Sequence, residues 1–130
     1  MTDMDHEEAL IRAFILPTRR DRYLECLKKP KKRARFCAEL AHFKALDPKY
    51  AIGILPRLQH APLIHELLIA KGAGQKCWVI SESREMDGRE LDLKTALKET
   101  VGGGMGTLIS CVPGKLGYFE DEDNRFILER

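Results

Sequence analysis

The spacing of the apolar residues changes near residue 75, and this change constrains the fold more than any other feature of the sequence. Before it, apolar side chains recur every three or four residues, which is the period of amphipathic helices. After it come short runs rich in β-branched and aromatic residues, such as 77–80 and 107–112, which are typical of strands. The sequence therefore predicts an α+β fold with a helical N-terminal half.

About four helices are expected before the change. Pro17 and Pro30 separate the first three, because proline has no N–H to continue a helix but fits the first turn of a new one. Gly72 ends the fourth with a left-handed cap. Residues 47–60 contain two prolines and alternating isoleucines, which predicts an ordered, extended connection. The expected helices cover 5–16, 18–29, 30–47 and 62–71.

The second half predicts a small, mostly antiparallel sheet with one inserted helix, in the order β-α-β-β-β. Asp92 is expected to cap the inserted helix, and Pro113 followed by Gly114 predicts a type II turn between two strands. We expect the helices to pack on one face of this sheet. The 130 residues suit a single domain, 1–130. The expected strands cover 77–80, 107–112, 116–119 and 125–129.

The composition, with 44% hydrophobic and 32% charged residues, is typical of a water-soluble globular protein. The first eight residues are acidic, whereas a signal peptide begins with basic residues. No uncharged apolar stretch is long enough to span a bilayer. These features predict a cytoplasmic protein that does not contact membranes.

The cysteines and histidines lack metal-binding spacings. Cys26, Cys37, Cys77 and Cys111 form no Cys-x-x-Cys pair, which excludes zinc knuckles and thioredoxin-type dithiols. No two of the four histidines stand four residues apart, the spacing that places both on one helical face. The sequence therefore predicts reduced thiols, no metal and no cofactor.

The glycine run 102–106 follows a predicted helix and precedes a strand, the reverse of the order in phosphate-binding loops. This order predicts a helix cap and a close passage against another backbone. The alternative is a ligand pocket lined by Gly103, Gly104 and Cys111, in a small-molecule-binding protein or small enzyme. No complete catalytic set accompanies Cys111, which favours a function other than catalysis.

Two acidic clusters resemble binding loops only superficially. In the first, around Gly88, Lys94 stands where a calcium-binding loop needs its closing carboxylate. The interpretation is a solvated loop whose acids stabilise the start of the next helix, and the second cluster, 120–123, is interpreted as a solvated turn. The acids of the first cluster are Glu82, Glu85, Asp87, Glu90 and Asp92.

The basic segment from residue 19 to residue 35 departs most from an average composition. It holds nine cations, opposed only by Asp21 and Glu25. The bland interpretation is a solvated face; the functional hypothesis is a surface for an anionic macromolecule, either an acidic protein or nucleic-acid phosphate. Only Tyr23 and Phe36 lie near enough to stack on bases. The acidic turn of a second copy, giving a homo-oligomer, is a further candidate partner. The nine cations are Arg19, Arg20, Arg22, Lys28, Lys29, Lys31, Lys32, Arg33 and Arg35.

Overall fold

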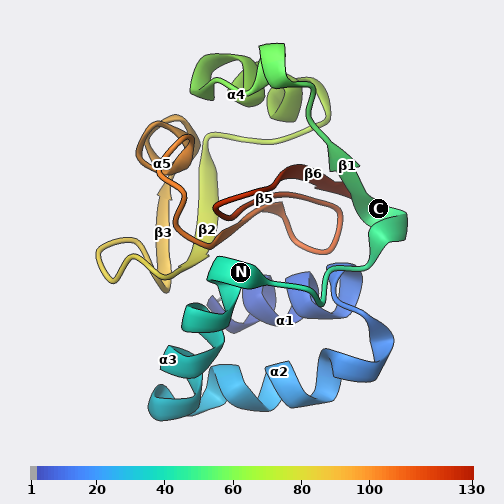
Figure 1. Ribbon diagram of the computed structural model, residues 1–130, viewed down its shortest axis with the longest axis vertical. Coiled ribbons are helices and arrows are strands. Elements are labelled where there is room, and N and C mark those ends of the chain that lie inside the picture. The colour runs from blue at the N-terminus through green and yellow to red at the C-terminus, as the bar shows by residue number, and fades with distance from the viewer. Residues whose placement is uncertain (1–2) are drawn as a thin grey trace.

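The computed structural model describes the backbone of residues 3–130 and the side chains from His6 onward. Within that range, five α-helices and a six-stranded antiparallel sheet confirm the α+β class and the helical first half (Figure 1). The strands lie in the order β1-β6-β5-β4-β2-β3. The helices are α1 (Asp3–Phe14), α2 (Arg20–Lys28), α3 (Pro30–Glu39), α4 (Ala61–Ala70) and α5 (Leu93–Thr100). The strands are β1 (Ala51–Gly53), β2 (Lys76–Ser81), β3 (Arg89–Asp92), β4 (Thr107–Val112), β5 (Leu116–Glu120) and β6 (Arg125–Glu129).

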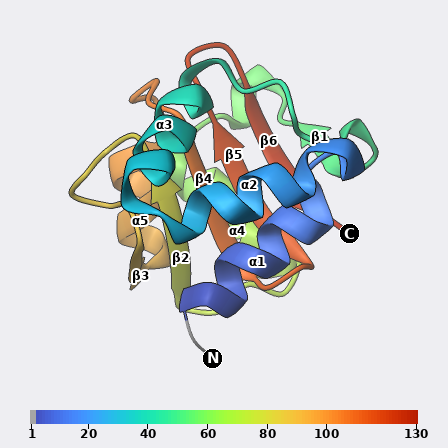
Figure 2. The same ribbon diagram turned by 90° about the horizontal axis from the view of Figure 1, so that it is seen from below.

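The helices cover both faces of the sheet, so the expectation of a single covered face is wrong. Figure 2 shows α1 and α2 crossing one face, with α4 on the far side. The alternation along β2 explains the arrangement: Trp78 and Ile80 belong to the core under α1–α3, whereas Cys77 and Val79 belong to the core under α4 and α5. Because the central strands are apolar on both faces, both faces have to be covered.

The third helix ends earlier than its apolar spacing predicts. It was expected to continue to Asp47, but α3 stops at Glu39 and a single 3-10 turn follows. The chain then runs beside the end of α1, where Ile15 and Leu46 form an antiparallel bridge. This tertiary pairing takes up the backbone groups that a longer helix would have used internally.

Two short strands were not expected, and both lie at the edges of the sheet. β1 forms within the connection 47–60, which is ordered and partly extended as predicted, and Ile52 pairs with Ile127 of β6. β3 follows the turn at Gly88 and pairs with β2. Charged residues make up most of β3, which hides its strand character in the sequence but suits an exposed sheet edge.

The predicted caps and turns of the second half are confirmed. Asp92 accepts a hydrogen bond of 3.1 Å from the amide of Thr95 and so caps α5. Gly102, with φ of +87°, follows the end of α5, and Gly114, with φ of +72°, lies in the turn between β4 and β5. None of the helices in the described range is both long and apolar enough to cross a membrane.

Candidate functional site

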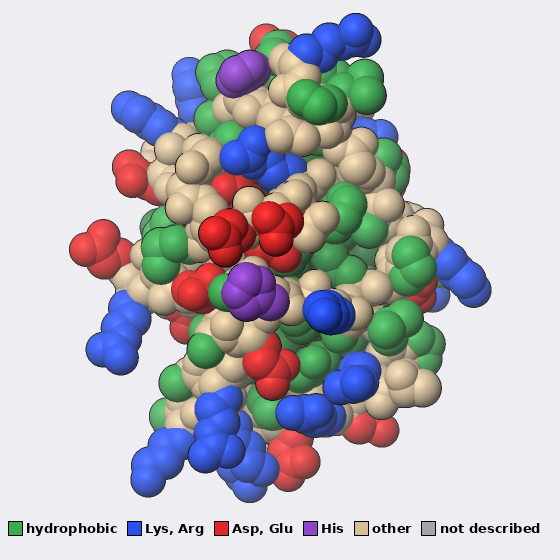
Figure 3. Space-filling view, viewed as in Figure 1, with side chains coloured by type: hydrophobic (Ala, Val, Ile, Leu, Met, Phe, Trp, Pro, Cys, Tyr) green, Lys and Arg blue, Asp and Glu red, His purple; other side chains and the backbone are tan. Residues whose placement is uncertain are grey.

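Most of the predicted basic segment lies on the outer side of α2 and α3. Figure 3 shows Lys and Arg side chains along the lower edge of the molecule, where α2 and α3 lie in Figure 1. Seven of the nine predicted cations are exposed, and we refer to them together as the basic surface. The basic surface consists of Arg19, Arg22, Lys28, Lys29, Lys31, Lys32 and Arg35.

The other two cations of the predicted site have structural roles. Arg20 is partly buried and donates a hydrogen bond of 2.9 Å from Nε to the carbonyl of Ile15, at the end of α1. Arg33 points away from the basic surface and binds two carboxylates, Glu7 and Asp87. The seven exposed cations can contact a partner. The guanidinium groups of Arg20 and Arg33 cannot do so in the same way, because they are bound within the protein.

Arg33 is the centre of a nearly buried ion-pair cluster. It donates two hydrogen bonds of 2.7 Å to Glu7 and bonds of 2.9 and 3.0 Å to Asp87. The Trp78 indole N–H also donates to Glu7, at 2.8 Å. Burial lowers the pKa of Arg33, but the hydrogen bonds and charges of Glu7 and Asp87 outweigh burial and raise it above its usual value. The cluster joins α3 to α1 and to the loop between β2 and β3.

The cations of the basic surface are only partly neutralised. Arg22 pairs with Glu39 at 3.5 Å, and Lys29 pairs with Glu25 at 3.9 Å. Both pairs are largely exposed, so each contributes little stability. Among the residues whose side chains are described, no carboxylate lies within ion-pair distance of the remaining five: Arg19, Lys28, Lys31, Lys32 and Arg35.

Lys31 and Lys32 stand in an electrostatically unusual position. They occupy the first turn of α3, which contains no acidic residue, and the preceding Lys29 makes no side-chain cap. The N-terminal end of a helix carries a partial positive charge, so cations there add to the potential of the same sign. The two lysines and the end of α3 therefore raise the local potential together at the junction of α2 and α3.

The aromatic residues near the cations do not reach the surface. Tyr23 is 4% exposed and Phe36 is 1% exposed, and their rings pack edge to face at 4.9 Å in the core. The Tyr23 hydroxyl donates to Glu39 at 3.2 Å. The two aromatic residues nearest the cations are therefore not available to stack on bases, and the basic surface offers charge without an aromatic platform.

An apolar groove, which the sequence did not indicate, adjoins the basic surface between α1 and α2. It has a volume of about 410 Å³. Its Leu24 and Leu27 follow the helical period of the sequence but are only partly buried. No signal in the sequence separates a leucine that seals a core from one that lines a groove. The lining residues are Glu7, Glu8, Arg12, Leu24, Leu27 and Lys28.

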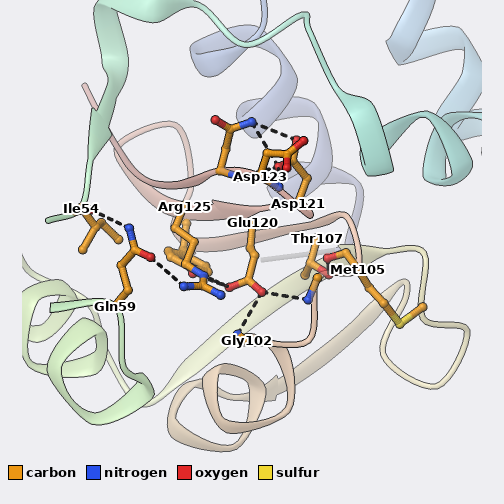
Figure 4. Close-up of polar contacts among 12 residues, drawn as sticks. Ile54, Gln59, Gly102, Met105, Thr107, Glu120, Asp121, Asp123 and Arg125 are labelled. Carbon is orange, nitrogen blue, oxygen red and sulfur yellow. Dashed lines mark hydrogen bonds and ion pairs between the residues drawn. The ribbon is translucent and has the colours of Figure 1, made fainter. Parts of the chain in front are cut away.

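The backbone amides of the glycine loop donate hydrogen bonds to a carboxylate of the same chain. Glu120 is completely buried, and its Oε2 accepts hydrogen bonds from the amides of Gly102 at 3.0 Å and Gly104 at 3.2 Å (Figure 4). Its Oε1 accepts from the Tyr118 hydroxyl at 2.7 Å and from Arg125 at 3.2 Å. The two loop amides are thus already bound to an anion.

Several acids that were interpreted as solvated have structural roles. Glu82 accepts a hydrogen bond of 2.6 Å from the amide of Gly106, and Asp87 binds Arg33. In the second cluster, Glu120 and Asp121 are buried, and Asp121 accepts from the amide of Asn124 at 2.7 Å. Buried carboxylates require such partners. The interpretation of a solvated turn is therefore wrong for Glu120 and Asp121, whereas Glu82 and Asp87 are half-buried and hydrogen-bonded.

The three residues proposed for a small-molecule pocket do not share one surface. Gly103 lines a groove of about 470 Å³ together with Ser81, Met105 and Thr107. Cys111 belongs instead to the core under α4 and α5. Burial raises the pKa of its thiol, so the nucleophilic thiolate is disfavoured at neutral pH.

The described histidine, cysteine and acidic side chains form no group of three that could hold a metal ion. His6 is instead built into the helix–sheet contact. Its Nδ1 lies 2.9 Å from the Ser110 hydroxyl, and its ring stacks on Trp78.

The chain matches no protein-family model, no curated protein and no solved structure. Its function therefore has to be inferred from the chemistry of its surface. Among the surfaces described, the basic surface combines exposure with unneutralised charge of one sign.

Proposed function

We propose that this chain is a small binding module that uses the basic surface to contact an anionic macromolecule. The observation that carries the proposal is the set of five exposed cations with no carboxylate within ion-pair distance in the described structure. We place this activity in the cytoplasm, where reducing conditions keep the four free thiols reduced.

Electrostatic attraction between a protein surface and an anion depends on distance. At physiological salt a charge acts over about 8 Å, so cations must be close together to reinforce one another. Lys28, Lys31 and Lys32 lie within five residues across the junction of α2 and α3. Clustered charge of this kind raises the local concentration of an anionic partner and speeds encounter.

Two partner classes fit charge alone: the phosphates of a nucleic acid and the carboxylates of an acidic protein surface. Without an exposed aromatic platform, binding to nucleic acid is expected to be insensitive to base sequence and to weaken steeply with salt. The acidic turn of a second copy is a weaker candidate, because Glu120 and Asp121 are buried and only Glu122 and Asp123 remain exposed.

The test is charge reversal on the basic surface. Fluorescence anisotropy with labelled RNA, DNA and polyglutamate probes compares the wild type with the Lys31→Glu, Lys32→Glu, Arg35→Glu variant. Arg33 is left intact, since its loss would disturb folding. The matched control reverses three exposed lysines elsewhere: Lys94→Glu, Lys98→Glu and Lys115→Glu.

The expected result is a loss of about tenfold or more in affinity for the anionic probes in the basic-surface variant at low salt, since several anion contacts are removed together. The control carries the same net charge and is expected to stay close to the wild type. Equal losses in both variants, or no binding by the wild type to any of the three probes, would contradict the proposed function.

Small-molecule binding is a second candidate function, favoured by the groove that contains Gly103. Met86, Leu91 and Met105 on its wall offer apolar contact. A thermal-shift screen of metabolite-sized ligands, repeated with Met105→Arg to obstruct the groove, tests this candidate. A ligand that stabilises the wild type and the variant equally binds elsewhere and counts against it.

A further inference from the structure

The groove between α1 and α2 gives the basic surface an apolar anchor. Leu24 and Leu27 stand one helical turn apart on α2 and line the groove together. Both pack only partly against the core, and within the described chain Tyr23 alone of the α2 residues is fully buried. The part of these two leucines that stays exposed is apolar area that another apolar group can bury.

The two acids that line the groove are already paired. Glu7 accepts hydrogen bonds from Arg33 and Trp78, and Glu8 pairs with Arg12 at 3.0 Å. Their charge is therefore compensated within the molecule. Lys28, on the same groove, has no carboxylate within ion-pair distance in the described structure. The uncompensated charge at the groove is positive.

Lys28 links the groove to the rest of the basic surface. Arg33 reaches Glu7 in the groove wall, so α3 lies close to α1 beside the groove. Lys31 and Lys32 are exposed on the first turn of α3, but neither lines this groove, and Lys32 lines a separate groove between α2 and α3. An apolar floor beside an unpaired cation suits an amphipathic helix that carries acidic residues next to its apolar face.

We propose that the partner of the basic surface is an acidic amphipathic helix of another protein, seated in the groove between α1 and α2. Its apolar face covers Leu24 and Leu27, and a carboxylate beside that face pairs with Lys28. The inference rests on the proposed function and specifies its partner. A nucleic acid fits the groove less well, because a phosphate backbone has no apolar face to bury there and no aromatic residue of the described chain lines the groove to receive its bases.

The probe is a synthetic labelled peptide of about 18 residues, or five helical turns, with leucines three and four residues apart and glutamates elsewhere. A scrambled peptide of the same composition keeps the charge but has no apolar face. A single-stranded DNA of similar charge gives the third arm. Anisotropy is measured at low and at physiological salt with the full chain.

Leu24→Gln replaces an apolar side chain of the groove by a polar one. Lys28→Glu reverses the charge of the cation that lines the groove and leaves the core unchanged. Ile69→Gln, on the exposed side of α4, and Lys94→Glu, on α5, are the matched controls. Thermal unfolding shows whether Leu24→Gln is folded. If Leu24→Gln does not fold, the Lys28→Glu variant still tests the proposed peptide site. Its fold is expected to be unaffected, because Lys28 is exposed and makes no ion pair with a described carboxylate.

The amphipathic peptide is expected to bind about tenfold tighter than the scrambled one and to retain binding at physiological salt, because burial of apolar area is not screened. Leu24→Gln and Lys28→Glu are each expected to weaken the affinity for the amphipathic peptide several-fold. The two control variants are expected to bind this peptide as the wild type does. Equal binding of the two peptides, or tighter binding of the DNA with no effect of Leu24→Gln, would overturn this inference while leaving the proposed function standing. Loss of the proposed function has a separate signature: no response of any probe to charge reversal on the basic surface.

Discussion

Arg33 and Glu7 are joined by two parallel hydrogen bonds of 2.7 Å between α3 and α1. In this geometry the planar guanidinium matches both oxygens of one carboxylate, which is stronger and more directional than a single contact. Arg33 is 19% exposed and Glu7 is 10% exposed, so the pair is largely shielded from water. One member of a basic run thus stabilises the fold, while its neighbours Lys31 and Lys32 face solvent.

Replacing Arg33 by alanine is expected to lower the free energy of unfolding by about 3–5 kcal/mol, because two shielded carboxylates lose their cation. Urea unfolding followed by circular dichroism measures the loss. The matched control, Arg35→Ala, removes an exposed cation two residues away and is expected to cost less than about 0.5 kcal/mol. Similar small losses in both variants would show that the cluster contributes nothing to stability.

Glu120→Gln is expected to destabilise the glycine loop by at least about 2 kcal/mol, because a buried acceptor of charge-assisted hydrogen bonds is lost. The new amide N–H group would face groups that already donate, Gly102 and Gly104 on one oxygen or Tyr118 and Arg125 on the other. Urea unfolding and amide hydrogen exchange at Gly102 and Gly104 report the change. Glu122→Gln, at an exposed neighbour, is the control; an equal effect there would exclude a specific role for Glu120.

The sequence predicted those features that depend on neighbouring residues. The period of apolar residues gave the helical half, and the local chemistry of Asp92 and Gly114 gave a cap and a turn that the structure confirms. Features that depend on distant partners were not accessible. The early end of α3 depends on the pairing of Ile15 with Leu46, and β3 forms because β2 supplies its hydrogen bonds.

In the candidate site, too, local features could be predicted from the sequence and features that depend on distant residues could not. The exposure of Lys31 and Lys32 follows from charge, which is a local property. The inward orientation of Arg33 depends on Glu7 and Asp87, which are 26 and 54 residues away in the chain. Spacing alone does not distinguish Arg33 from its neighbours.

Gly106→Ala is expected to be severely destabilising, whereas Gly74→Ala is expected to be neutral or slightly stabilising. A Cβ at residue 106 would lie 2.5 Å from the Cβ and the carbonyl oxygen of Leu40, and backbone cannot give way as a flexible side chain can. A Cβ at residue 74 meets nothing within 4 Å, and alanine restricts the unfolded chain more than glycine does. Thermal unfolding of the two variants compares them directly. A stable, well-folded Gly106→Ala protein would contradict the close passage of the two backbones.

Three buried thiols are expected to make the protein lose stability as the pH rises above 9. Burial, with a smaller effect of neighbouring acids, raises the pKa of Cys37 and of Cys77 from 9.0 to about 12, and burial also raises the pKa of Cys111. Between pH 9 and about 12 the folded state keeps protons that the unfolded state releases, so the stabilisation is complete below pH 9 and declines as the pH rises through this window.

The decline is expected to be about 1.4 kcal/mol per pH unit for each buried thiol. Urea unfolding at a series of pH values from 8 upward measures the loss of unfolding free energy per pH unit. Cys77→Ala is expected to reduce this slope by about the contribution of one buried thiol. The control is Cys26→Ala, which removes the partly exposed cysteine. If Cys77→Ala and Cys26→Ala had the same slope as the wild type, alkaline destabilisation would have to come from other groups, such as Tyr118, whose pKa is raised by burial and by its hydrogen bond to Glu120.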